Sequence, residues 1–136
     1  MRIALQSALF LVGVCFGQAA YASCDRLEAL EAYKTTQSPP VGAKCAIYLG
    51  QSARSGVSCH WEYAFRDPSA TRFAAEIEAA VQQCRRGQLR GPDVLVNHPD
   101  SYDLREWETV TGIYSVSIKD KGGLSKTLVF LRFESK

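Results

Sequence analysis

The sequence has no closely spaced cysteine pair, only two histidines and no apolar run long enough to cross a membrane. Structural zinc sites and redox-active dithiols use cysteines separated by roughly two to four residues, as in C-x-x-C. The four cysteines from Cys24 to Cys84 are instead 21, 14 and 25 positions apart. This spacing argues against both kinds of site, and we expect neither a metal nor a cofactor.

The chain also has little excess charge of either sign. It contains 16 Lys and Arg residues against 14 Asp and Glu residues, and its formal net charge is +2. Proteins that bind nucleic acid are usually strongly basic, because they must neutralise phosphates. The composition therefore gives no support for a nucleic-acid partner.

The N-terminal segment is typical of a secretory signal peptide. Arg2 precedes an apolar run from Ile3 to Phe16, and Ala20-Tyr21-Ala22 matches an A-x-A cleavage site. The run is shorter than the roughly 20 residues that a transmembrane helix needs. We therefore expect residues 1–22 to be cleaved, and the remaining protein to have no stable insertion in a membrane.

Cleavage would leave residues 23–136, which is enough chain for one compact domain. Four cysteines remain in this segment, and an even number in an exported chain predicts disulfides. We expect the protein in the periplasm, with the extracellular medium as the alternative.

The hydrophobic pattern of residues 23–136 predicts a single α+β domain. Two segments show apolar residues at helical spacing, and the others alternate as strands do. The expected helices run from a Ser23 cap to Tyr33 and from an Asp67-Pro68 start to a stop at Gly87. The expected strands cover 44–49, 57–66, 113–119 and 125–133, with a short one at 94–96 and either a strand or a helical turn at 102–107.

This order, α-β-β-α-β-β(-β), indicates two helices packed on an antiparallel sheet of about four to five strands, braced by disulfides. The last strand is apolar on both of its faces around Leu128-Val129-Phe130-Leu131. A strand with this composition is typical of the interior of a sheet that is covered on both sides.

The cysteines can be paired from the predicted elements. Four cysteines allow three pairings. Cys45 and Cys59 lie on the same face of a predicted hairpin, where their Cβ atoms would be close enough to be bridged. Cys24 then pairs with Cys84 by elimination, which would tie the first helix to the end of the second.

A candidate recognition surface lies on the opposite face of the same hairpin. Tyr48, His60, Glu62 and Arg66 are out of phase with Cys59 and should lie together. An exposed patch of aromatic and polar side chains is typical of a protein-binding surface. We therefore expect a small exported binding or accessory protein, such as an inhibitor, an immunity-type protein or a chaperone-like factor, whose partner is another envelope or secreted protein.

The alternative is a small envelope hydrolase or a metal-dependent enzyme. His60 beside Glu62 could act as a general base, because a carboxylate raises the pKa of a neighbouring imidazole and orients it. His98, Asp100 and Asp103 form a second cluster in a polar loop, where catalytic residues often lie. Both groups also have ordinary structural explanations, a solvated sheet face for the first and turn chemistry for the second.

Overall fold

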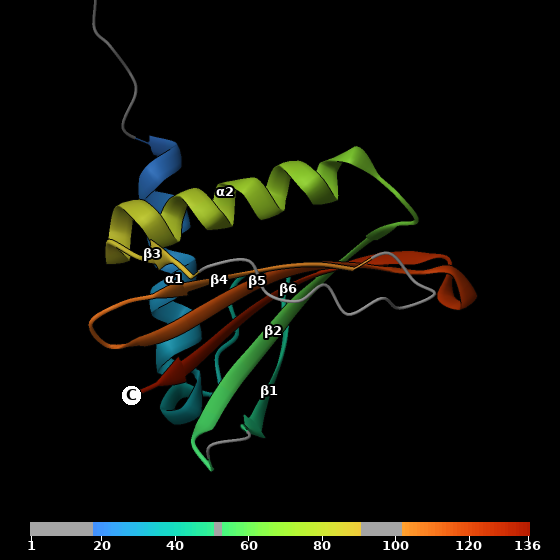
Figure 1. Cartoon of the computed structure of the whole chain (residues 1–136). Coiled ribbons are helices and arrows are strands. Elements are labelled where there is room, and N and C mark those ends of the chain that lie inside the picture. Colours follow the sequence, from blue (N-terminus) through green and yellow to red (C-terminus); the bar gives the residue numbers. More distant parts are fainter. Residues whose placement is uncertain (1–17, 51–52, 91–101) are drawn as a thin grey trace, which may run out of the picture.

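The structure, a computed structural model, describes residues 18–50, 53–90 and 102–136. It confirms the predicted α+β fold, with two helices and a sheet of six antiparallel strands in the described part of the chain (Figure 1). In chain order the elements are α1 (Gln18–Thr36), β1 (Lys44–Leu49), β2 (Ser55–Ala64), α2 (Pro68–Arg85), β3 (Gln88–Leu89), β4 (Tyr102–Glu108), β5 (Gly112–Lys121), a 3₁₀ turn (Gly122–Leu124) and β6 (Lys126–Ser135).

The order of strands across the sheet is β1-β2-β6-β5-β4-β3. The sheet has more strands than the four to five expected, because residues 102–108 form a full strand and the two residues of β3 pair with it. The expected strand at residues 94–96 and the expected signal peptide core lie outside the described residues.

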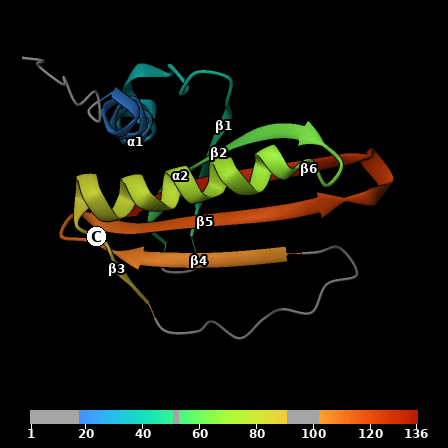
Figure 2. The same ribbon diagram turned by 90° about the horizontal axis from the view of Figure 1, so that it is seen from above.

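Both helices cover the same face of the sheet (Figures 1 and 2). The strand β6 is interior, as predicted, and its residues Val129 and Leu131 are buried under the helices. Leu128 and Phe130 point to the other face and are only partly buried, so the described part of the chain covers β6 on one side and does not supply the expected cover on the second. No helix or strand in the described part of the chain packs against this second face, which we call the open face.

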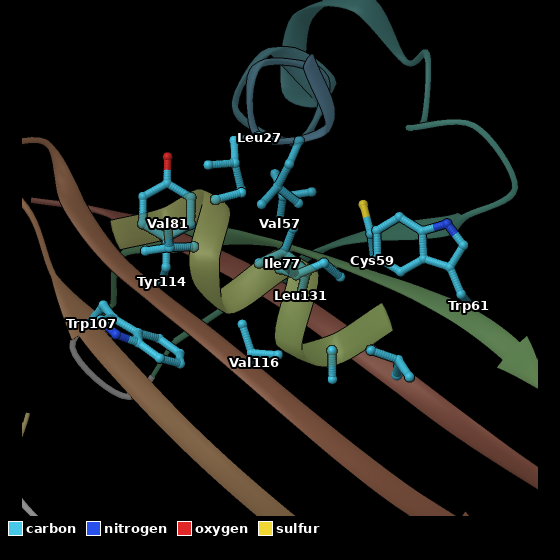
Figure 3. Close-up of a cluster of buried hydrophobic side chains, with 14 of the residues drawn as sticks. Leu27, Val57, Cys59, Trp61, Ile77, Val81, Trp107, Tyr114, Val116 and Leu131 are labelled. Carbon is cyan, nitrogen blue, oxygen red and sulfur yellow. The ribbon is translucent and has the colours of Figure 1, made fainter. Parts of the chain in front are cut away.

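The core lies between the helices and the covered face of the sheet (Figure 3). Leu27 and Leu30 of α1 are fully buried, and Ile77 of α2 is 1% exposed. These helical side chains pack on one phase of the strands, because alternate residues of a strand point to the same face. The fully buried strand residues include Val57, Cys59, Tyr114, Val129 and Leu131.

The start of α2 agrees with the prediction and its end differs by one residue. Asp67 is the N-cap, and its carboxylate accepts a hydrogen bond of 2.8 Å from the backbone N–H of Ser69, which lowers the pKa of Asp67. At the other end Arg86, and not Gly87, adopts the left-handed conformation, with φ of 51°. Gly87 is needed for space, because a Cβ there would lie 2.9 Å from Val81 and 3.0 Å from Trp107.

The helix α1 begins earlier than predicted. It starts at Gln18, so Ser23 lies inside the helix of this uncleaved chain and does not cap it. The reason is that Ala19, Ala20 and Ala22 are strong helix formers, and nothing before Ser23 stops the helix.

The predicted pairing of the cysteines is confirmed. Cys24 and Cys84 join α1 to α2 with a Cα–Cα distance of 5.8 Å, and Cys45 and Cys59 join β1 to β2 at 4.0 Å. Two disulfides indicate an oxidising, extracytoplasmic compartment. In the described ranges, no helix is both long enough and apolar enough to cross a membrane.

Candidate functional site on the open sheet face

The open face carries a row of aromatic and cationic side chains across the three strands β1, β2 and β6. The strand register places His60 of β2 opposite Phe130 of β6, and Ser58 opposite Arg132. Tyr48 of β1 lies on the same face, one strand further out. We call Tyr48, Arg132, Phe130 and His60 the aromatic strip.

Arg132 is the centre of the aromatic strip. Its guanidinium carbon lies 5.7 Å from the ring centre of Tyr48 and 5.7 Å from that of Phe130. Its Nε donates a hydrogen bond of 3.2 Å to Ser58 Oγ. A cation over aromatic faces is attracted by their quadrupoles, so the two rings and the hydroxyl hold this exposed guanidinium in place.

Tyr48 is positioned by a glycine. It is the cross-strand partner of Gly56, and its ring covers Gly56 so closely that a Cβ there would overlap the ring atoms. Burial, with the nearby Glu134 carboxylate, raises the pKa of Tyr48, while Arg132 opposes this shift. The hydroxyl of Tyr48 therefore stays protonated at neutral pH, because phenols ordinarily titrate only near pH 10.

Phe130 and His60 extend the aromatic strip toward the other end of the strands. Their ring centres are 5.4 Å apart, and the rings are tilted by 40°. This is an ordinary separation for a packed aromatic pair. The strip thus presents an apolar body with polar ends, which is the surface character that protein interfaces favour.

Glu62 lies beyond His60 and is held by two lysines. Its two carboxylate oxygens accept hydrogen bonds of 2.6 Å from Lys126 Nζ and 2.8 Å from Lys44 Nζ. These bonds lower the pKa of Glu62 to about 2. Two ammonium groups face one carboxylate, so this end of the open face keeps a net positive charge.

The His60–Glu62 pair does not have the geometry of an oriented general base. Nε2 of His60 lies 3.8 Å from Oε1 of Glu62, which is longer than a hydrogen bond. The same oxygen already accepts a hydrogen bond from Lys44 Nζ. The structure places the two residues side by side as predicted, but the carboxylate is engaged by lysines and does not orient the imidazole.

The second catalytic cluster cannot be assembled from the described residues, because His98 and Asp100 lie outside them. Asp103 is on β4 and lies on the covered phase of the sheet, since it pairs with Ile118. It lines a cavity of about 290 Å³ with Arg66, Asp67 and Asp120. His60 is on the open face, so His60 and Asp103 lie on opposite faces of the sheet.

Arg66 lies apart from the other predicted surface residues. The strand β2 ends at Ala64, and the chain turns there through a hydrogen bond from Asp67 N–H to Ala64 O. The period-2 pattern therefore no longer holds at Arg66, whose Nε lies 3.4 Å from Asp120 Oδ2. In the described ranges, no group of three or more His, Cys, Asp or Glu side chains is arranged to hold a metal ion.

Comparison with known proteins adds little to this geometry. No protein-family model matches the chain, and no curated protein is similar to it in sequence. One solved structure, that of CalU16 from Micromonospora echinospora, is 12% identical over 68% of this chain and 67% of its own, with a TM-score of 0.34. A likeness this distant supports no conclusion about function.

Sequence reasoning found part of the aromatic strip. It selected Tyr48 and His60 from the hairpin, together with the neighbouring Glu62. It missed Phe130 and Arg132, which come from the last strand. Phe130 and Arg132 are two residues apart and so share a face. This spacing predicts that Phe130 and Arg132 lie on one face of β6, but it does not predict that β6 pairs with β2.

Proposed function

We propose that this protein is a small exported binding protein that recognises another envelope or secreted protein through the open face of its sheet. The observation that carries this proposal is the guanidinium of Arg132, held between the rings of Tyr48 and Phe130 on a face that no described element covers. Arginine and tyrosine are enriched among the residues that dominate binding energy, especially where neighbours hold them in place. An inhibitor, an immunity-type protein or a chaperone-like factor would each use such a surface.

The chemistry of the face also describes the partner surface. Arg132 and the two lysines around Glu62 favour a partner with carboxylates. Phe130 and Tyr48 favour apolar or aromatic groups between those carboxylates. A partner patch that combines acidic and aromatic side chains fits both requirements.

The test is crosslinking of the purified protein to an extract of the cell envelope, followed by identification of what is retained. The Arg132→Ala variant should lose the retained partner, with a drop in affinity of about 30-fold or more, as expected for a dominant interface residue. Arg72→Ala is the matched control, because Arg72 is exposed on α2 and contacts Ser69.

A second variant tests the same face without removing a charge. Gly56→Ala should bind the same partner more weakly, because the added methyl group displaces the ring of Tyr48. Equal retention by wild type, Arg132→Ala and Arg72→Ala would overturn the proposal, as would the absence of any retained protein.

We also propose that residues 1–22 are a signal peptide and that the domain of residues 23–136 works in the periplasm. The apolar run and the Ala20-Tyr21-Ala22 triplet support cleavage, and the disulfides support an oxidising destination. Mass spectrometry of cell fractions should find a periplasmic protein that begins at Ser23. A full-length protein confined to the cytoplasm would contradict this.

A further inference from the structure

The strand β1 is one edge of the sheet, and its outward backbone groups bond to no other strand in the described part of the chain. The hairpin bond from Gly50 N–H to Arg54 O fixes which residues of β1 face β2. In an antiparallel pair the residues alternate between facing the partner strand and facing away. Tyr48, Ala46 and Lys44 are therefore bonded to β2, whereas Leu49, Ile47 and Cys45 direct their N–H and C=O groups outward.

One observation confirms this alternation. The hydroxyl of Tyr33 on α1 donates a hydrogen bond of 3.2 Å to the carbonyl of Cys45, which is possible only if that carbonyl points away from β2. Tyr33 thus covers one end of the edge. The backbone groups of Ile47 and Leu49 have no partner among the described residues.

The side chains beside these open groups are also unusual for an edge strand. Ile47 is 49% exposed and Leu49 is 74% exposed. Natural edge strands are normally protected by inward charges, prolines or bulges, because an open edge is a template for another strand. Residues 47–49 of β1 contain no charge, proline or bulge that would protect this part of the edge.

The two phases of β1 differ in chemistry. The phase of Ile47 and Leu49 is apolar, and the phase of the open face carries Lys44, the short side chain of Ala46 and the ring of Tyr48. Ala46 lies opposite Ser58, whose hydroxyl accepts from Arg132. A carboxylate on an added strand beside Ala46 would therefore lie on the same face as this guanidinium, in one row with Ala46 and Ser58.

We propose that an extended segment of the partner protein adds to β1 as a further strand, with apolar residues on one phase and acidic residues on the other. The apolar residues would pack beside Ile47 and Leu49, and the acidic residues would face Lys44 and Arg132. Recognition by strand addition combines backbone bonds for affinity with alternate side chains for specificity. This inference rests on the proposed function and names the kind of segment that the partner presents.

The experiment uses the full protein with two synthetic octapeptides, one alternating Val and Glu and one alternating Val and Lys. Binding is followed by amide hydrogen exchange. The Val/Glu peptide should slow exchange at Ile47 and Leu49 and bind about tenfold more tightly than the Val/Lys peptide, because a single charge contact of about 1.4 kcal/mol corresponds to that factor.

Two variants separate the edge from the rest of the molecule. Ile47→Pro removes an outward N–H without disturbing the bonds to β2, and Leu49→Lys places a charge on the apolar phase. Each variant should bind the Val/Glu peptide about tenfold more weakly than wild type does. Val110→Lys is the matched control, because Val110 is 92% exposed and lies in the turn between β4 and β5. It should bind as wild type does.

Several outcomes would overturn strand addition. These are equal binding of the two peptides, unchanged exchange at Ile47 and Leu49, or a dimer in sedimentation that is lost in Leu49→Lys, which would assign the edge to a second copy of the chain. The envelope partner separates this result from the proposed function. If Arg132→Ala loses that partner and Leu49→Lys keeps it, the open face binds but strand addition is wrong.

Discussion

Removal of the disulfide between Cys24 and Cys84 should destabilise the protein through its unfolded state. The bridge closes a span of 60 residues. In the chain-entropy model a loop of this length contributes about 4 kcal/mol, because the bridged chain has less conformational freedom to gain on unfolding. The Cys24→Ala, Cys84→Ala double variant should lose about this amount.

The native structure should survive the loss of this bridge. The helix α1 keeps Leu27 and Leu30 fully buried in the core, and burial of one such side chain contributes about 1.5–3 kcal/mol. A paired hydrogen bond from Arg85 to Glu31, at 2.7 and 3.2 Å, also joins α1 to α2. The double variant should therefore keep the circular dichroism bands of its buried aromatic side chains in the near ultraviolet.

The assay is urea unfolding followed by the fluorescence of the buried Trp61 and Trp107. With a dependence on urea of about 2 kcal/mol per molar, the midpoint should fall by about 2 M, and the slope should rise because the unbridged chain unfolds further. Glu31→Gln is the control and should shift the midpoint less. A change below about 1 kcal/mol, or release of α1 from the native domain, would refute the unfolded-state explanation.

Three further predictions concern single side chains. Glu62 has a native pKa of about 2, below its usual value near 4.3. The stability that it contributes is therefore fully present above about pH 4.3 and is lost as the pH falls toward 2. Urea unfolding at several pH values should show the stability of Glu62→Gln approaching that of wild type at the acid end. The hydroxyl of Tyr114 is buried without a partner among the described residues, so Tyr114→Phe should raise stability by about 1 kcal/mol in thermal unfolding, and a loss of that size would show that the hydroxyl is bonded. Leu30→Ala removes a fully buried side chain and should cost about 2–5 kcal/mol in urea, whereas a cost under 1 kcal/mol would mean that α1 is not part of the core.

The local features of the fold could be predicted from the sequence because their causes are local. Asp67 accepts a hydrogen bond from a backbone N–H of the first turn of α2, and Pro68 has the backbone angle that the first residue of a helix needs. Both effects depend only on neighbouring residues. The pairing of Cys45 with Cys59 followed from the phase of two neighbouring strands, which a short loop brings together. Neither inference needed a distant part of the chain.

The features that depend on distant pairing could not be predicted in the same way. Arg132 joins the aromatic strip only because β6 pairs with β2, and no local pattern specifies which strand a strand will choose. The position of Arg66 was misjudged for a different and local reason, since the turn at Ala64 ends β2 two residues before it. The sequence therefore predicted the residues of the proposed site that belong to the hairpin of β1 and β2, but not those of β6.

The place of β6 in the sheet has a consequence for how this chain can be made and moved. β6 is the last strand in the sequence, yet it lies between β2 and β5 and joins two sheet halves that are otherwise separate. Until residues 126–135 have been synthesised, the chain can form only separate hairpins and helices, whose apolar faces stay exposed. While a ribosome or an export channel still holds residues 126–135, the two halves of the sheet therefore stay unjoined, and the complete domain can form only after that strand is released.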